Sequence, residues 1–212
     1  VKELVRRKQK VVVLDNLSSG YVKNIEPFKN KIKFIQGDIA NVKDVEKAVK
    51  GVDFVLHLAA SLSVVESVLE PGKYFKNNGA RQDASSSYVG VIPIFSKLMS
   101  QGKQPIVFGD GKQTRDFVSV KDVALANINA CNFNKADNQT INIGSGQEIS
   151  VNDLYQKIAT ILDFKLAPSY QPARSGEATR ALGDLSRMRN ILKIKPRKMF
   201  DGLKGTVKWY RA

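Results

Sequence analysis

The sequence predicts an α/β protein in which a parallel sheet occupies much of the N-terminal part. Two apolar runs, 11–14 and 52–60, are hydrophobic enough to be covered on both faces, as strands of a parallel sheet are. Segments with the apolar spacing of helices alternate with such runs, which is typical of βαβ units. A hydrophobic content of 42% in 212 residues, without a long apolar run, allows one domain or two small ones. It indicates a soluble, cytoplasmic protein without a membrane segment or signal peptide.

The N-terminal segment predicts the later part of a dinucleotide-binding βαβ unit. Residues 1–10 look like the second half of a helix, and the strand 11–14 leads to Asp15. A dinucleotide fold uses an acid at the end of its second strand to bind ribose hydroxyls. Taken alone, Asp15 is equally well explained as a turn-forming residue. The context favours the cofactor role, and a carboxylate favours NAD over NADP because it repels a 2′-phosphate.

A second strand and a short helix follow. Residues 31–36 alternate polar and apolar side chains, as a strand does, and lead to Gly37 and Asp38. Asn41 is placed to cap a helix that Gly51 ends. We expect the buried face of this helix to consist of Val42, Val45 and Val49.

The strand expected at 52–60 ends in small residues, which would let a cofactor approach the backbone closely. It contains His57, the only histidine of the chain. A lone histidine in an apolar strand is more often packed than catalytic, so we assign it no chemistry.

The stretch 105–123 carries the densest set of signals. A short strand, 105–108, leads into Gly109-Asp110-Gly111, a tight turn whose glycines supply positive φ. Ser119 then begins a helix, with Asp122 as an approximate capping box. We expect its buried face to contain Val120, Val123, Ala124 and Ile128. Between turn and helix lies Arg115, whose guanidinium suits bidentate capture of a phosphate; the alternative is a surface ion pair with Asp110 or Asp116.

The remaining elements predict a smaller mixed α/β lobe. Residues 90–95 begin a helix with proline in its first turn, and Gly102 lies past its end. Residues 140–146 indicate a strand and a turn, after which Ser150 and Asp153 cap another helix. The Gly-Ser-Gly of that turn resembles a phosphate cradle but lacks the lysine and serine of a P-loop, which favours a structural turn.

The net charge of +14 is concentrated near the C-terminus. Residues 187–212 contain nine Lys or Arg and one acid. The segment lacks the aromatic and glycine pattern of an RNA-binding strand and any zinc-finger spacing. Helical spacing of its apolar residues favours a solvated basic face, which would attract anionic substrates. The single cysteine, Cys131, is expected to be a small buried hydrophobe, and no disulfide or metal site is expected.

Several motifs resemble one family. The pattern F-G-D-G-x-Q-T-R-D-F-V-x-V-x-D-V at 108–123 closely resembles the nucleotide-sugar-binding loop of the extended short-chain dehydrogenases/reductases, in particular the UDP-glucose 4-epimerase group. D-N-L-S-S-G at 15–20, H-L-A-A at 57–60 and P-A-R-S-G-E at 172–177 resemble further segments of that family. The resemblance implies a Rossmann-type sheet, incomplete in this sequence, with residues 1–78 as a partial NAD-binding lobe and 79–212 mainly as a nucleotide-sugar-binding lobe. It also implies a homodimer.

The resemblance assigns site residues by position. The expected contacts with NAD are Asp15, Asn16 and Leu17 at the adenosine ribose, Asp38 and Ile39 at the adenine, and Leu58, Ala59 and Ala60 at the pyrophosphate and nicotinamide ribose. The expected contacts with the nucleotide sugar are Val91, Phe108, Arg115 and Arg174, the two arginines gripping its diphosphate. The implied reaction is epimerisation at C4 of a UDP-sugar through a 4-keto intermediate.

The sequence departs from the family at two places. No G-x-G-x-x-G occurs, and none of the six tyrosines is followed four residues later by lysine, as the catalytic Tyr-x-x-x-Lys requires. Residues 79–83 resemble a family segment that normally lies well beyond that motif. A parallel sheet that lacks internal strands exposes apolar faces and edges. We therefore expect Asn78 and Gly79 to flank a gap in a longer chain, with an intact mass clearly above 23.5 kDa.

Other functions stay open on the sequence alone. A nucleotide-sugar 4,6-dehydratase or a UDP-glucuronate decarboxylase would share these motifs, because the acids that identify them lie in the absent block. A non-catalytic nucleotide-sugar-binding or nucleic-acid-binding remnant is the alternative of another class, supported by the missing tyrosine and lysine and by the basic C-terminal segment. We favour the enzyme, with a UDP-sugar as substrate and without a membrane or nucleic-acid partner.

Overall fold

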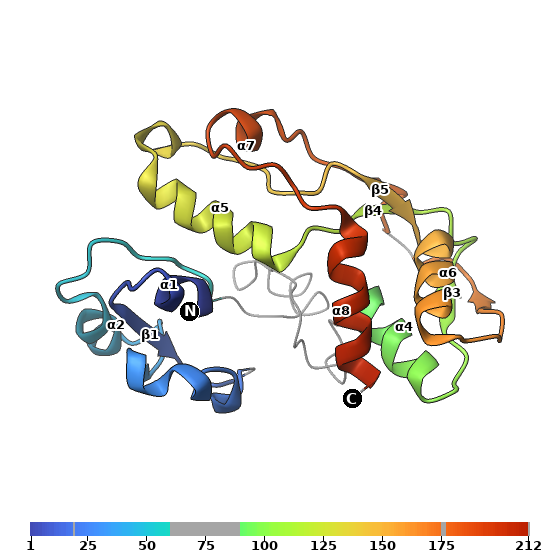
Figure 1. Ribbon diagram of the computed structural model, residues 1–212, viewed down its shortest axis with the longest axis horizontal. Coiled ribbons are helices and arrows are strands. Elements are labelled where there is room, and N and C mark those ends of the chain that lie inside the picture. Colours follow the sequence, from blue (N-terminus) through green and yellow to red (C-terminus); the bar gives the residue numbers. More distant parts are fainter. Residues whose placement is uncertain (19, 60–89, 175–176, 212) are drawn as a thin grey trace. The chain divides into compact units, whose positions relative to one another are not determined.

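The computed structural model describes residues 1–18, 20–59, 90–174 and 177–211. The chain divides into two compact units, Val1–Ala60 and Ser61–Ala212. Both contain helices and strands (Figure 1), and the predicted α/β class is confirmed. The predicted lobe boundary at 78/79, and with it the Asn78–Gly79 junction, lies outside the described residues.

The first unit contains a parallel pair of strands. Its elements are α1 (Lys2–Arg6), β1 (Val11–Asp15), two 3-10 turns (Val22–Asn24 and Glu26–Lys31), β2 (Ile32–Gln36) and α2 (Val42–Val49). β1 and β2 pair in parallel from Val11 opposite Ile32 to Asp15 opposite Gln36. Both predicted strands are thus confirmed, and their carboxyl ends lie at the same edge.

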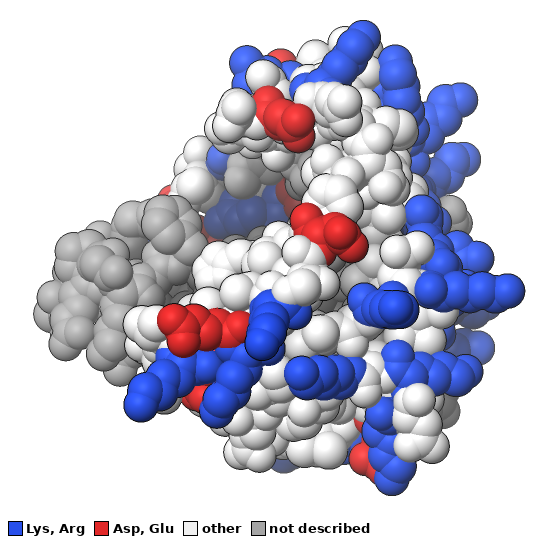
Figure 2. Space-filling model, turned by 90° about the vertical axis from the view of Figure 1, so that its left-hand side faces the viewer, with Lys and Arg blue, Asp and Glu red and all other residues white. Residues whose placement is uncertain are grey.

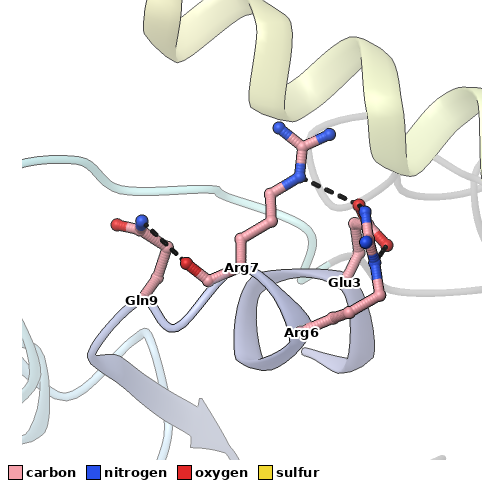
Figure 3. A network of polar contacts seen from close by, with 4 residues as sticks. All are labelled: Glu3, Arg6, Arg7 and Gln9. Atoms are coloured by element: carbon pink, nitrogen blue, oxygen red, sulfur yellow. Dashed lines mark hydrogen bonds and ion pairs between the residues drawn. The ribbon is translucent and has the colours of Figure 1, made fainter.

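Helix α1 is held by a cluster of charged side chains at the surface (Figure 3). The carboxylate of Glu3 accepts hydrogen bonds from Arg6 Nε at 2.8 Å and from Arg7 Nε at 2.9 Å. Gln9 donates to the carbonyl of Arg7 at 3.3 Å, where the chain turns toward β1. The two guanidinium groups lower the pKa of Glu3 to about 2. Because Arg6 is exposed and Glu3 and Arg7 are only half-buried, the cluster fixes local geometry and contributes little to stability.

The buried face predicted for α2 is wrong, although its cap is right. Asn41 accepts from Lys43 N at 3.0 Å, as predicted. Val42, however, is 69% exposed, and the half-buried residues of the helix are Asp44, Val45 and Ala48. The cause is Asp44, whose carboxylate accepts from the backbone N–H of Asp38 at 3.2 Å and turns that side of the helix inward.

The strand predicted at 52–60 does not form in the described residues up to Ala59. Phe54, Val55 and Leu58 are each more than 60% exposed, and His57 is exposed rather than packed. A strand is stable only with a neighbour to accept its backbone hydrogen bonds. Within the described part of this unit, the paired strands are β1 and β2 alone.

The second unit is the predicted mixed α/β lobe. Its helices are α4 (Val91–Ser100), α5 (Val120–Asn132), the 3-10 turn Asn134–Ala136, α6 (Val151–Leu162), α7 (Ser186–Asn190) and α8 (Met199–Arg211). Its strands are β3 (Ile106–Phe108), β4 (Thr114–Asp116), β5 (Glu148–Ser150), β6 (Ser169–Gln171) and β7 (Arg180–Ala181). β3 pairs in parallel with β6, while β4 lies between antiparallel β5 and parallel β7.

Two apolar clusters hold this unit together. The larger joins α4, α6 and α8, which pack against one another (Figure 1), through fully buried side chains such as Phe95, Leu154 and Val207. Ser150 caps α6 by accepting from Asp153 N at 3.0 Å, as predicted. The smaller cluster joins α5 to the segment around α7 through Ala126, Met188 and Leu192.

Three local predictions in this unit are corrected. Residues 140–143 form no strand, and Ile141 and Ile143 instead pack as an irregular segment against the smaller cluster. Ile128 of α5 is buried as predicted, but Val120 is 47% exposed, and the other buried residues of this helix are Asp122 and Ala126. Asp122 does not complete a capping box, because its carboxylate accepts from Arg197 N at 2.8 Å and from the Arg197 guanidinium.

The basic C-terminal segment has the predicted solvated face. Leu203 and Val207 of α8 are buried, whereas Lys204 and Lys208 are exposed. Figure 2 shows lysine and arginine side chains projecting from many separate places on one face of the molecule, with acidic side chains among them. None of the helices in the described ranges is long and apolar enough to cross a membrane.

Candidate functional site

Polar side chains gather where β1 and β2 end. Asn16 donates from Nδ2 to Asp38 Oδ2 at 2.8 Å, and Asp38 Oδ1 accepts from Ala40 N at 2.8 Å. These two hydrogen bonds, that of Ala40 first, lower the pKa of Asp38. The parallel pairing thus brings the predicted residues Asn16 and Asp38 into direct contact, from positions 22 apart in the sequence.

Asp15 forms a turn, one of the two roles that the sequence left open. Its Oδ1 accepts from Leu17 N at 2.7 Å, which fixes a turn with Leu17 at a φ of 59°. The residue is nevertheless exposed at the end of β1, where a ribose can reach its carboxylate. A Cβ on Gly20 would lie 3.4 Å from that carboxylate, so the chain folds back closely over it.

Asp44 supports this edge from α2, and sequence reasoning did not find it. A Cβ at Gly37 would lie 2.8 Å from the carboxyl carbon of Asp44, so only glycine allows the close approach that lets Asp44 bind Asp38 N. Ile39 is 49% exposed beside this turn. Leu58 and Ala59 lie in an exposed irregular segment, and Ala60 is outside the described residues.

The residues at this edge fit one part of a dinucleotide. Exposed carboxylates and backbone groups at the carboxyl ends of parallel strands suit the hydroxyls and amino group of an adenosine. The acid at Asp15 disfavours a 2′-phosphate. A phosphate-binding glycine turn has no counterpart in the sequence, so the fit concerns the adenosine alone.

A second cluster surrounds Arg115 in the other unit. Arg115 Nη2 donates to Glu177 Oε1 at 2.9 Å, and Nη1 donates to the carbonyl of Thr114 at 2.8 Å. The guanidinium carbon of Arg174 lies 3.8 Å from the centre of the Phe108 ring. The backbone N–H of Glu177 donates to the Arg174 carbonyl at 3.3 Å. The structure therefore places Phe108, Arg115 and Arg174 around one turn of the chain.

Strand pairing explains this placement. Phe108 is opposite Gln171 in the β3–β6 pair, and Gly109 N donates to the Gln171 carbonyl at 2.8 Å. Arg174 follows Gln171 by three residues and so reaches the ring of Phe108. Gly109 has a φ of 74°, as predicted, and a Cβ built there would make an ordinary contact with the Ala173 Cβ at 3.5 Å, so the backbone conformation and not the space favours glycine.

The Gly-Asp-Gly turn is fixed by α6. Asn152 donates from Nδ2 to the Asp110 carbonyl at 2.9 Å, and its backbone N–H donates to the Gly111 carbonyl at 3.0 Å. Gly111 has a φ of 72°, and a Cβ there would overlap the Asn152 amide at 2.0 Å. The turn before Arg115 is thus rigid, as the sequence indicated.

Asp116 shows why the Gly-Ser-Gly turn is structural. Its two carboxylate oxygens accept from Ser145 N at 2.8 Å and from Gly146 N at 2.9 Å, and the Ser145 hydroxyl also donates to it. A Cβ on Gly144 would lie 2.5 Å from the same carboxylate. The N–H groups that could hold a phosphate are therefore occupied by Asp116.

The partners predicted for Arg115 are corrected. Asp116 binds the Gly-Ser-Gly turn, and Asp110 lies 3.6 Å from Lys112 in an exposed pair. The partner of Arg115 is Glu177, which sequence reasoning did not single out. Val91 lies in the first turn of α4 and packs against the core cluster that contains Val107, the neighbour of Phe108.

Comparisons with known proteins agree with these observations. Residues 72–144 match the profile of the NAD dependent epimerase/dehydratase family, and residues 1–82 match that of GDP-mannose 4,6 dehydratase. A putative UDP-glucose 4-epimerase of Methanocaldococcus jannaschii is 28% identical over 293 residues, which span 100% of this chain and 93% of the relative. A UDP-N-acetyl-alpha-D-glucosaminuronate decarboxylase of Bacillus cytotoxicus is 28% identical over 211 residues, 96% of this chain and 64% of the relative.

Structural similarity covers nearly the whole chain. The crystal structure of UDP-glucose 4-epimerase with UDP-glucose from Thermotoga maritima matches 99% of this chain and 93% of its own, with a TM-score of 0.88 and 25% identity. The predicted Rossmann-type class is confirmed. The alignment with the Methanocaldococcus jannaschii protein is 293 positions long, and this chain has 212 residues. The difference, 81 alignment positions, carries no residue of this chain. This supports the expectation that a block present in the relatives is missing here.

Proposed function

We propose that the chain is a member of the NAD-dependent epimerase/dehydratase family, whose profile it matches over residues 72–144, and that it binds a UDP-sugar and NAD for epimerisation at C4, of the UDP-glucose/UDP-galactose type. The observation that carries this proposal is the cluster of Phe108, Arg115 and Arg174 around one turn. Two guanidinium groups on neighbouring backbone segments suit the two phosphates of a nucleoside diphosphate.

The two arginines would bind the diphosphate from two segments of the chain. Arg115 is held on β4 by its own hydrogen bond to the Thr114 carbonyl, so its guanidinium has little freedom to lose on binding. Arg174 is oriented by the face of the Phe108 ring, an arrangement that a planar guanidinium favours over an ammonium group. Phe108 and Val91 would border the nucleotide from the same side of the lobe.

The first unit would bind the adenosine of NAD. Asp15 would accept hydrogen bonds from the ribose hydroxyls, with Asn16 and Leu17 beside it, while Asp38 and Ile39 would border the adenine. By resemblance, Leu58 and Ala59 would border the rest of the cofactor, and Ala60 lies outside the described residues. When bound, NAD supplies the acceptor and the donor of hydride for the sugar carbon. No tyrosine of this sequence has the lysine partner of the family, so we assign proton transfer to none of its residues.

The charge of Asp15 gives a test of the cofactor assignment. Asp15→Asn keeps an oxygen for Leu17 N, so the turn should survive, but it removes the charge that favours NAD. We expect NAD binding to weaken by about 1.5 to 3 kcal/mol, the scale of a hydrogen bond to a charged group. Calorimetric titration of NAD and NADP would measure this, with Asp53→Asn, an exposed acid of the same unit, as the control. NADP binding as tight as NAD to the unmodified protein would refute the assignment.

Two other reactions compete with epimerisation. The Bacillus cytotoxicus relative is named as a decarboxylase, and one matching profile is that of a 4,6-dehydratase. Incubation with NAD and either UDP-glucose or UDP-glucuronate, followed by NMR of the products, separates them. From UDP-glucose, UDP-galactose is the expected product of the intact protein, whose chain we expect to contain the block that is absent from this sequence. Release of carbon dioxide, or a 4-keto-6-deoxy sugar, would replace the proposal by one of these reactions. UDP binding without any conversion would favour a non-catalytic nucleotide-sugar-binding protein.

A further inference from the structure

The guanidinium of Arg115 is already paired with an acid. Glu177 Oε1 lies 2.9 Å from Arg115 Nη2, and the two side chains are half-buried, with exposed fractions of 34% and 26%. The backbone of Glu177 is tied to Arg174, whose carbonyl accepts its N–H at 3.3 Å. The backbone of Glu177 is therefore held at Arg174 while its carboxylate pairs with Arg115, the two arginines that would bind the diphosphate. An anionic ligand approaching them meets one negative charge as well as two positive ones.

Glu177 differs from the structural acid of the neighbouring sheet. Glu148 accepts from Arg180 Nε on both oxygens at 2.8 Å and from the Thr114 hydroxyl at 2.7 Å. These donors, Arg180 first, lower the pKa of Glu148. Within the described residues, the Glu177 carboxylate accepts from Arg115 alone. A carboxylate with one side-chain partner can leave it far more readily than one with three donors.

We propose that Glu177 is an internal competitor for the diphosphate: it occupies Arg115 while the site is empty and yields the guanidinium to a phosphate when the ligand binds. This inference rests on the proposed function, because it assumes that Arg115 contacts the diphosphate. Carboxylate and phosphate both match the fork of a guanidinium. Arg115 Nη1 stays bound to the Thr114 carbonyl, so the exchange requires Glu177 to move and leaves the arginine in place.

The exchange would make the site selective for highly charged ligands. A diphosphate carries more charge than a carboxylate and can also reach Arg174, so it would displace Glu177. A monophosphate has a single phosphate group to offer in competition with the same acid. Glu177 would therefore lower the affinity of the site for every phosphate ligand. The proportional loss of affinity would be largest for ligands that bind weakly.

The inference is tested with inorganic diphosphate, which offers the two phosphate groups without the nucleoside or the sugar. Glu177→Gln keeps the size of the side chain and removes its charge. We expect it to bind inorganic diphosphate about tenfold more tightly than the unmodified protein, equivalent to about 1.4 kcal/mol. Asp110→Asn removes the same charge from the nearby turn, where Asp110 pairs with Lys112, and should change the affinity less than twofold. Isothermal titration calorimetry gives both values.

A double-mutant cycle shows whether the effect acts through Arg115. In an Arg115→Leu background, Glu177→Gln should no longer strengthen binding of inorganic diphosphate. Equal or weaker binding by Glu177→Gln, the same gain in the Arg115→Leu background, or no detectable binding to any of these proteins would overturn the inference. The proposed function is tested separately: if the unmodified protein prefers UDP to UMP while Glu177→Gln has no effect, the competitor role fails and the substrate site stands.

Discussion

Replacing Arg197 by leucine is expected to lower the free energy of unfolding by about 3 to 5 kcal/mol, the cost of leaving a buried charge without its partner. Asp122 is 1% exposed, and its carboxylate accepts from the guanidinium and the backbone N–H of Arg197. The substitution keeps the backbone hydrogen bond and removes the counter-ion. The carboxylate is then buried without a cation beside it.

Replacing Asp122 instead of Arg197 should lower the free energy of unfolding by less. The side chain of Arg197 is 46% exposed, so water can solvate it when Asp122 is changed to asparagine. We expect about 1 to 3 kcal/mol for Asp122→Asn, the value of a lost charged hydrogen bond. Lys198→Leu removes an exposed cation from the next position and should change stability by less than about 0.5 kcal/mol. Urea unfolding of the three variants measures how much free energy of unfolding each one loses. Equal losses for Arg197→Leu and Lys198→Leu would contradict the expected ranking.

The features predicted correctly are those that neighbouring residues determine. Asn41, Ser119 and Ser150 cap their helices as the sequence indicates, because each cap binds a backbone N–H two or three residues away. The positive φ of Gly109 and Gly111 follows from the turn itself. Such local rules need no knowledge of the rest of the fold.

The features missed depend on partners far away in the sequence. Asp122 reaches Arg197 across 75 positions, and Arg115 reaches Glu177 across 62. Local spacing assigned Asp122 to a capping box and offered only neighbouring acids as alternative partners of Arg115, because a sequence shows which charges exist and not which strands bring them together. The parallel pairing of β3 with β6 brings Phe108 close to the segment that leads to Glu177.

Strand predictions failed for a related reason. Residues 52–59 are apolar enough for a buried strand but have no strand beside them within the described residues. Residues 140–143 pack against the smaller core cluster without pairing. An apolar run indicates that a segment is suited to burial. A strand also requires a neighbouring backbone segment that accepts and donates its hydrogen bonds. The rotated face of α2 has a different cause: one carboxylate, that of Asp44, outweighs the apolar pattern of the helix.

A second large effect, on the binding of UDP, is expected at the proposed nucleotide-sugar site. If Arg115 and Arg174 each contact a phosphate, Arg115→Leu or Arg174→Leu should weaken UDP binding by about 2 to 5 kcal/mol, partly because phosphate charge is left unpaired. Lysine should rescue either position only in part, since it cannot reproduce the guanidinium fork. Lys112→Leu is the matched control: this cation lies on the same loop with 83% of its side chain exposed, and its loss should be nearly neutral.

The measurement that tests this account most directly is calorimetric titration of UDP and UMP into the unmodified protein, Arg115→Leu, Arg174→Leu and Lys112→Leu. The account predicts that the unmodified protein and Lys112→Leu bind UDP at least about tenfold more tightly than UMP, a difference of about 1.4 kcal/mol. It predicts that each of the other two variants loses most of that preference. Equal affinity of all four proteins for UDP, or no preference of the unmodified protein for UDP over UMP, would contradict the assignment of a nucleotide-sugar site at these arginines.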